Sequence, residues 1–101
     1  PGLLESAYQE CLEKEFQKRN VRFKKEHFMP IYYEGDVLKT PYRIDFLVED
    51  SVIVELKSVE KILPVHEAQT LTYLKLSNYK LALLINFNSP LIKNGIKRFV
   101  L

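Results

Sequence analysis

The sequence predicts an α/β domain in which a mixed central sheet is flanked by helices and the main elements follow the order αβββαβ. Two strand patterns at residues 42–48 and 52–57 are joined by a short run of turn-forming residues. A helical pattern at residues 64–77 then leads into the apolar run LALLINF at 81–87, which is typical of a central strand. A strand, a helix and a second strand in this order make a right-handed parallel crossover.

Length and composition indicate one ordinary globular domain. The chain has 101 residues, of which 47% are hydrophobic and 28% charged, so we expect residues 1–101 to form a single domain. The formal net charge of +2 is too weak to identify a nucleic-acid-binding protein by itself. The chain opens on Pro1-Gly2 without an initiator methionine, so we expect a few residues to precede it.

The single cysteine bears on the cellular compartment. Cys11 cannot form an internal disulfide, which fits a reducing compartment, and a cytoplasmic protein is expected. Cys11 falls on an apolar helical stripe, where a small core residue is expected rather than a nucleophile. We see no signal peptide or membrane span in the sequence.

The first element is a helix predicted over residues 3–18. Its apolar positions follow the spacing of a stripe that faces a core: Leu4, Ala7, Tyr8, Cys11, Leu12 and Phe16. Glu5 falls inside this stripe, whereas Glu10 and Glu13 fall on the solvent side. A buried carboxylate is costly unless it is paired or binds a metal. Glu5 is therefore either a third inward acid or a first-turn acid that favours the helix dipole.

Strand patterns of mixed polarity follow. Residues 21–28 can form a strand that Met29-Pro30 interrupts, which is typical of a sheet edge. Residues 31–38 read as a hairpin with Gly35 at its tip. The basic residues between 18 and 25 are either a solvated helix end or a phosphate-binding patch. The tyrosines of this region are half-buried sheet aromatics or stacking platforms for bases: Tyr32, Tyr33 and Tyr42.

The stretch at residues 42–58 carries the chemistry. Alternation places Ile44, Phe46 and Val48 on one face of the first strand, with Asp45 on the other. If residues 49–51 form the turn, Val48 pairs with the first residue of the next strand.

The same counting sets Asp45 directly opposite Glu55, with Lys57 on the same face. Opposed like charges are destabilising. A divalent cation such as Mg²⁺ relieves the repulsion by binding carboxylate oxygens. The alternative is a solvated polar face in which Lys57 pairs with one acid.

A second helix is predicted over residues 64–77, with Pro64 at its first position and Asn78 as a left-handed cap. One stripe contains Val65, Gln69, Tyr73 and Leu76. Gln69 lies at its centre, and a buried amide needs partners, so Gln69 and Tyr73 either line a site or form a satisfied core pair. His66 is weak evidence for a metal ligand because no second histidine lies nearby. Residues 91–94 are expected to form a short helix or turn, and residues 96–100 an edge strand.

Taken together, these stretches resemble the GxxExxY proteins, a small family within the PD-(D/E)XK nuclease superfamily. The resemblance covers nearly the whole chain and rests on GLLESAY at 2–8, YRIDFLVED at 42–50, VIVELKSVEKILPVHEAQTLTYL at 52–74, LLINFN at 83–88 and GIKRFV at 95–100. It implies a restriction-endonuclease-like α/β core and a metal-dependent phosphodiesterase site.

The resemblance also implies residue roles. Asp45 and Glu55 match the metal-binding acids, and Lys57 matches the lysine that positions or activates the attacking water. Glu5 matches a helix acid that some members add to the metal site, and the Leu56 carbonyl is expected as a further ligand.

Gln69 and Tyr73 match the Q-x-x-x-Y motif of the exonuclease-like branch. Ile44 stands where the superfamily name has a proline, and Thr40-Pro41 replaces an expected glycine, which implies an altered loop.

The residue pattern and the resemblance together predict a nuclease that uses Mg²⁺ or Mn²⁺ to hydrolyse nucleic-acid phosphodiester bonds. DNA is favoured over RNA as the partner, no membrane partner is expected, and a homodimer is one expected assembly. The alternative is a catalytically inactive module of the same fold that binds nucleic acid or a protein partner. Small size and modest net charge favour the alternative, whereas retention of the acids and of Lys57 argues against it.

Overall fold

A computed structural model describes residues 2–39 and 42–101, and it confirms the predicted α/β fold. The Thr40-Pro41 pair lies outside these residues. The elements in chain order are α1 (Gly2–Lys18), β1 (Phe23–Met29), β2 (Tyr32–Tyr33), β3 (Asp36–Val37), β4 (Tyr42–Val48), β5 (Val52–Lys57), α2 (Pro64–Leu76), β6 (Leu81–Asn86), the short 3₁₀ helix η1 (Ile92–Gly95) and β7 (Ile96–Val100). No helix in the described ranges combines the length and apolar character that a membrane crossing needs.

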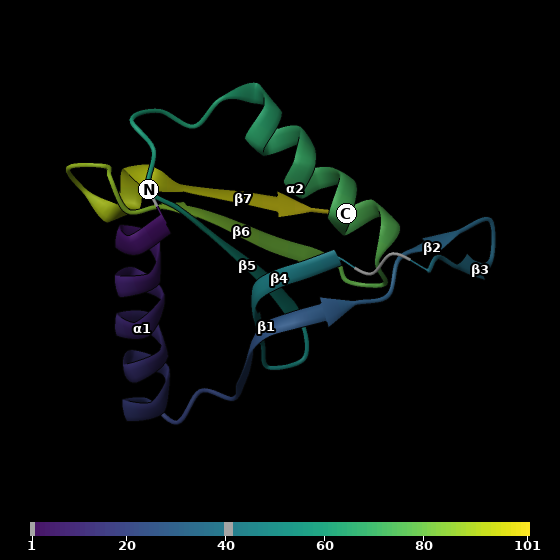
Figure 1. Cartoon of the computed structure of the whole chain (residues 1–101), viewed down its shortest axis with the longest axis horizontal. Coiled ribbons are helices and arrows are strands. Elements are labelled where there is room, and N and C mark those ends of the chain that lie inside the picture. The colour runs from purple at the N-terminus through teal and green to yellow at the C-terminus, as the bar shows by residue number, and fades with distance from the viewer. Residues whose placement is uncertain (1, 40–41) are drawn as a thin grey trace.

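The central sheet has five strands in the order β1-β4-β5-β6-β7. Among the described strands of this sheet, β5 and β6 pair in parallel, because the intervening chain crosses over through α2, and the other neighbours are antiparallel. The strands predicted as edges, β1 and β7, are the edges. The hairpin formed by β2 and β3 is a separate small sheet that projects from the body (Figure 1), with Gly35 at its tip in the left-handed region, at a φ of 85°.

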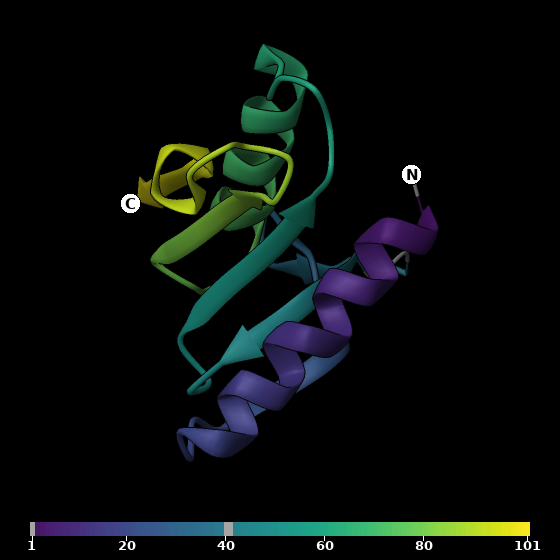
Figure 2. The same ribbon diagram turned by 90° about the vertical axis from the view of Figure 1, so that its left-hand side faces the viewer.

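The two long helices lie on opposite faces of the sheet (Figures 1 and 2). The face under α2 buries one apolar cluster, which contains Met29, Ile44, Leu47, Ile53, Leu74 and Ala82. The face under α1 buries a second cluster of Phe46, Val54 and Leu56, against which Leu12 and Phe16 of α1 pack. Burial of these side chains is the main force that holds the layers together.

The buried face of α1 differs from the predicted stripe. Cys11 is exposed, and so is Leu4, while the side chain of Glu13 is only 19% exposed. The predictions of a core cysteine and of a solvent-facing Glu13 are therefore wrong. The physical reason is an ion pair: Glu13 lies 3.1 Å from Lys25 on β1, so this side of the helix packs through polar groups.

The buried face of α2 is also rotated from the predicted stripe. Thr70 and Leu74 are its buried residues, whereas Val65 is 63% exposed and Gln69 is exposed. The predicted burial of Val65 and Gln69 is wrong. The helix packs on β5 and β6 through the neighbouring stripe, where Leu74 joins the cluster that contains Ile53 and Ala82. The C-cap is Ser77 in an extended conformation rather than a left-handed Asn78.

The basic cluster of residues 18–25 is held in ion pairs. Arg22 and Lys24 pair with Glu49 and Asp50 in the turn between β4 and β5, at 3.5 and 3.4 Å. This arrangement favours the solvated-charge interpretation of the cluster over a phosphate-binding patch.

Candidate active site

The hairpin of β4 and β5 has the register that the sequence predicts. Val48 pairs with Val52, and the ladder continues to the pair of Phe46 and Val54. The turn closes through a 3.0 Å hydrogen bond from the Ser51 N–H to the Val48 carbonyl. The register therefore brings the two predicted acids to the next rung.

At that next rung the strands no longer pair with each other. The backbone N–H of Leu56 instead donates a 2.7 Å hydrogen bond to Oδ2 of Asp45. The carboxylate of Asp45 thus occupies the place that a backbone carbonyl would take in a regular ladder. The result is a local opening between β4 and β5, beside Glu55.

The ladder between β4 and β1 is interrupted at the same rung. Lys25 and His27 have partners on β4, but Glu26 between them has none, and its φ is 49°. A non-glycine residue rarely adopts this conformation, and it costs about 1 kcal/mol or more. Glu26 also pairs with Arg43, at 3.9 Å. Three acids on adjacent strands, Glu26, Asp45 and Glu55, therefore share an irregular rung.

This irregularity corrects one prediction about β4. Ile44 packs with Leu47 in the cluster under α2, whereas Phe46 and Val48 pack under α1. The predicted shared face of Ile44, Phe46 and Val48 is therefore wrong at Ile44. Strict alternation fails because the backbone departs from the ladder at Asp45.

Glu55 is a buried acid with an unpartnered oxygen. The residue is 8% exposed, and within the described part of the chain its Oε1 has no hydrogen-bond partner. Burial, followed by the charge of Asp45, raises the pKa of Glu55 to about 8, although the charge of Lys57 opposes the shift. Such a group is costly to hold ionised unless a cation lies beside it.

The pKa of Asp45 is also raised, but by influences that partly oppose one another. Burial raises the pKa of Asp45, the hydrogen bond from the Leu56 N–H lowers it, and the charge of Glu5 raises it again. The electrostatic influence of Glu5 means that the first turn of α1 lies near this rung. Glu5 is itself partly buried, as the inward interpretation of this acid predicts.

Two acids of this rung have the chemistry that a hard cation requires. In residues 2–39 and 42–101, no group of three or more His, Cys, Asp or Glu side chains is arranged to hold a metal ion. Two carboxylates nevertheless share one rung, both with raised pKa values, and one oxygen lacks a partner. Carboxylate oxygens are the ligands that Mg²⁺ and Mn²⁺ prefer. Asp45 and Glu55 therefore fit a divalent cation, and Glu5 is near without completing a three-acid cluster.

Gln69 and Tyr73 are brought together on α2. Nε2 of Gln69 donates a 2.6 Å hydrogen bond to the hydroxyl oxygen of Tyr73. The ring of Tyr73 stacks on Tyr42 of β4, with ring centroids 3.2 Å apart. Burial, followed by the charge of Glu55, raises the pKa of Tyr42. The contacts from Gln69 through Tyr73 to Tyr42 therefore reach the neighbourhood of the acids.

From the sequence, Tyr42 was expected to be a half-buried sheet aromatic or a residue on which bases stack. Its position beside the two acids was not predicted. Its position in the sequence could have indicated this, because Tyr42 begins the strand that carries Asp45. His66, by contrast, is used in the structure of the helix, because its Nδ1 accepts a 2.9 Å hydrogen bond from the Leu63 N–H.

Asn86 is a second residue that sequence reasoning missed. Its side chain brackets Val59, accepting from the Val59 N–H at 3.1 Å and donating to the Val59 carbonyl at 2.9 Å. The Phe87 N–H also donates to the Lys57 carbonyl at 2.9 Å. These bonds fix the end of β5 that carries Lys57. The signal was a lone amide in the apolar run LALLINF, since a buried amide needs partners.

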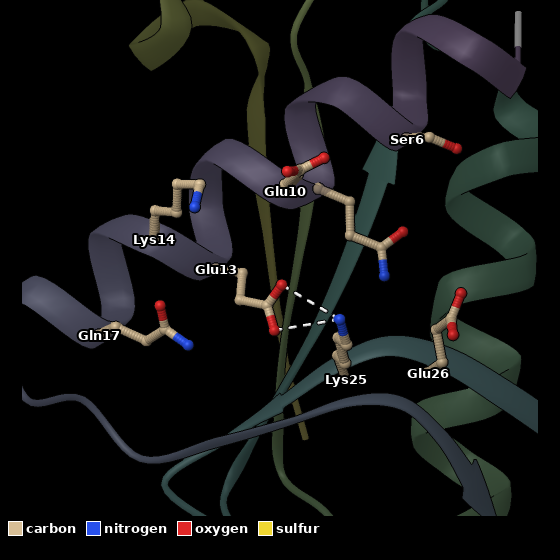
Figure 3. A pocket seen from close by; sticks show the side chains of 8 residues that line it. Ser6, Glu10, Glu13, Lys14, Gln17, Lys25 and Glu26 are labelled. Atoms are coloured by element: carbon tan, nitrogen blue, oxygen red, sulfur yellow. Dashed lines mark hydrogen bonds and ion pairs between the residues drawn. The ribbon is translucent and has the colours of Figure 1, made fainter.

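A separate groove of about 380 Å³ lies between α1 and β1. Figure 3 shows Glu13 reaching from α1 to Lys25 across this groove, with Glu26 further along β1. Its lining mixes acids, lysines and amides, so it offers no single charge to a ligand.

Comparison with family models identifies a superfamily that covers nearly the whole chain. The family model described as the PD-(D/E)XK nuclease superfamily matches residues 1–99. Neither a curated protein nor a solved structure shows significant similarity to this chain.

Proposed function

Since the chain belongs to the PD-(D/E)XK nuclease superfamily, we propose that it is a nuclease that hydrolyses phosphodiester bonds with Mg²⁺ or Mn²⁺. One observation carries the proposal: partly buried Asp45 and buried Glu55, whose Oε1 has no hydrogen-bond partner among the described residues, lie close to Lys57 on β5. DNA is the proposed substrate in preference to RNA.

Asp45 and Glu55 would hold the cation, with Glu5 and the Leu56 carbonyl as further ligands. When bound, such a cation lowers the pKa of a water molecule and neutralises charge on the phosphate. The chain contributes the fixed position of the acids. The Leu56 N–H holds Asp45 in the gap between the strands, and burial of Glu55 keeps water from screening the pair.

Lys57 would position the attacking water and bind a phosphate oxygen. Ile53 packs in the cluster under α2, and Glu55 and Lys57 follow it at steps of two residues, so both side chains lie on the α2 face of the sheet. In the described part of the chain Lys57 forms no ion pair within 4.0 Å, although two acids lie nearby. Its ammonium group is thus available to a phosphate.

Gln69 and Tyr73 would bind the substrate at the edge of the site. Their hydrogen bond and the stacking of Tyr73 on Tyr42 support this role, because they link α2 to the strand that carries Asp45. A preformed arrangement of this kind lowers the entropic cost of binding.

We propose further that the chain is a GxxExxY-type member of the superfamily. Two residues of the motif have supporting contacts. Glu5 lies near Asp45, and the ring of Tyr8 stacks on Phe87 with centroids 4.5 Å apart. Because Phe87 directly follows β6, the Tyr8 contact holds the start of α1 against the end of the sheet where Lys57 lies. The tyrosine of the motif would thus position the glutamate.

A cytoplasmic location and a homodimer are part of the same proposal. The thiol of Cys11 is exposed, which suits a reducing compartment. A second copy would enlarge the small surface with which 101 residues can hold nucleic acid.

The second candidate function is a non-catalytic module that binds nucleic acid or a protein. The observation that favours it is that no cluster of three potential metal ligands occurs in the described ranges. The two functions differ in one consequence, since only the nuclease requires Lys57 for turnover.

The test is cleavage of labelled single-stranded, double-stranded and branched DNA and RNA, with Mn²⁺ or with a chelator. We expect metal-dependent cleavage that Lys57→Ala lowers at least about a hundredfold. The matched control is Lys75→Ala, which removes an exposed lysine of α2. Equal cleavage by Lys57→Ala and wild type would reject the proposed mechanism, and the absence of both cleavage and Mn²⁺ binding would favour the second candidate.

A further inference from the structure

The positive charge of this protein is unevenly distributed. Residues 51–101 contain seven Lys or Arg residues and three acids, whereas residues 1–50 contain eight and ten. All seven ion pairs of the described residues use cations between Lys18 and Arg43. The cations of the second half, including Lys57, therefore form no ion pair within 4.0 Å in the described ranges.

A cavity of about 270 Å³ lies among these free cations, where β6 and β7 meet the connection that follows β5. Figures 1 and 2 show the chain segments after β5 and after β6 gathered at this end of the sheet. The lining includes two lysines, Lys61 and Lys97, with Asn88, Ser89 and Asn94, and a single acid, Glu60. Ammonium, amide and hydroxyl groups are donors suited to phosphate oxygens.

The cavity adjoins the proposed active site. Lys57 is the direct neighbour of Asn86 across the parallel β5–β6 pair, and Asn86 lines the cavity. Leu84 is the common neighbour of Glu55 on β5 and of Lys97 on β7. Adjacent strands are about 4.8 Å apart, so the backbone at Lys97 lies about 10 Å from that at Glu55.

Glu55 and Lys97 also lie on the same face of the sheet. Ile53 and Phe99 both pack in the cluster under α2. Side chains two residues apart on a strand point to the same face. Glu55 follows Ile53 by two residues, and Lys97 precedes Phe99 by two, so both face the α2 side.

The walls of the cavity are fixed by packing. Asn86 is 5% exposed and is held by its two hydrogen bonds to Val59. Gly95 is buried directly against the Asn86 carbonyl, where an added Cβ would collide with the oxygen. A cavity with walls held in this way needs little reorganisation to accept a ligand.

We propose that this cavity is a second phosphate-binding subsite, which holds a phosphate of the nucleic-acid chain next to the one that is cleaved. Lys61 and Lys97 would supply the charge, and Asn88 and Asn94 would supply the neutral donors. Glu60 opposes the binding and limits its strength. The proposal deepens the proposed nuclease function and rests on it. It places the substrate backbone across the carboxyl ends of β5 and β6, toward β7.

The test measures binding without cleavage. A fluorescent single-stranded oligonucleotide is titrated into the Asp45→Asn chain with chelator present, at several salt concentrations. The variant pair Lys61→Ala/Lys97→Ala is compared with Lys75→Ala/Lys80→Ala, which removes the same charge outside the cavity. We expect the first pair to bind about tenfold more weakly and to lower the salt slope by about 1.4. Glu60→Gln should bind a few-fold more tightly.

Thermal unfolding checks that each variant is folded. Equal loss in both lysine pairs, or no loss in the first, would overturn the subsite, and so would the absence of any binding by the Asp45→Asn chain. Oligonucleotides with and without a 5′-phosphate distinguish a terminal phosphate from an internal one. Weaker binding of either oligonucleotide by Lys61→Ala/Lys97→Ala supports the subsite. Failure of the nuclease function would appear elsewhere, as missing Mn²⁺-dependent cleavage by the wild-type chain while this binding difference persists.

Discussion

The carboxylate of Asp45 accepts a 2.7 Å hydrogen bond from the backbone N–H of Leu56, between two strands that have ceased to pair. This bond joins the fold to the proposed chemistry. It satisfies a backbone donor that would otherwise lack a partner, and it fixes an acid beside buried Glu55. The site is therefore formed by an interruption of the sheet.

Two substitutions of Asp45 should separate stability from metal binding. Asp45→Asn keeps an oxygen that can accept from the Leu56 N–H, whereas Asp45→Ala leaves that donor unpaired. We expect Asp45→Ala to unfold more easily than Asp45→Asn by about 1–3 kcal/mol in urea denaturation. Both should lose metal-dependent cleavage. Equal stability of the two variants would mean that the hydrogen bond does not support the fold.

Glu55 should make stability depend on pH when metal is chelated. Its folded-state pKa is about 8 against an ordinary value of 4.5, so the folded chain keeps a proton that the unfolded chain releases. The stabilisation is complete below pH 4.5 and is lost as the pH rises through 8. Unfolding in urea at a series of pH values should show this decline.

Glu55→Gln supplies the control for that decline, because the amide cannot ionise. We expect this variant to be more stable than wild type at pH 9 by a few kcal/mol and to lose most of the slope between pH 5 and 8. Glu10→Gln, which neutralises an exposed acid of α1, should leave the slope unchanged. An identical slope in Glu55→Gln would contradict the assignment of the raised pKa.

The order of elements was predictable because each has a clear local pattern. The bounds of β4 and β5 were predicted as observed, since alternating β-branched residues flank a turn and fix the register at Val48 and Val52. Once the register is fixed, counting alone brings Asp45 and Glu55 together. Helical spacing left two orientations open for Glu5, and the structure has this side chain partly buried.

The buried faces of the helices were less predictable, because they depend on partners that sequence spacing does not reveal. Glu13 is covered through its pairing with Lys25, a residue on another element. Likewise, the irregular backbone at Glu26 has no local signal, since its sequence reads as an ordinary strand. These features arise from tertiary contacts that outweigh local preference.

Tyr73 should contribute differently through its ring and its hydroxyl. Tyr73→Phe keeps the stack on Tyr42 but removes the acceptor for Gln69, so we expect a stability loss below about 1 kcal/mol. Tyr73→Ala also loses the ring and should cost about 2 kcal/mol or more. If the pair binds substrate, Tyr73→Phe lowers cleavage severalfold at unchanged stability. Unchanged cleavage would assign Tyr73 a purely structural role.

Asn86 should hold the end of β5 through Val59. Asn86→Ala removes two hydrogen bonds to that backbone and should cost about 1–3 kcal/mol. Asn86→Asp keeps the acceptor for the Val59 N–H and should lie between Ala and wild type. Cleavage should fall in the same order, because the neighbouring Lys57 loses its support. Equal denaturation midpoints for all three proteins would rule out this bracing role.

The central claim is that Asp45 and Glu55 are held together to bind a divalent cation, and Mn²⁺ titration by calorimetry tests it most directly. We predict saturable binding by wild type, release of protons near pH 7 because Glu55 must ionise, and loss of binding in Asp45→Asn. Asp36→Asn, which changes an exposed aspartate of the β2–β3 hairpin, should bind as wild type does. Absence of binding by wild type, or equal binding by Asp45→Asn, would contradict the claim.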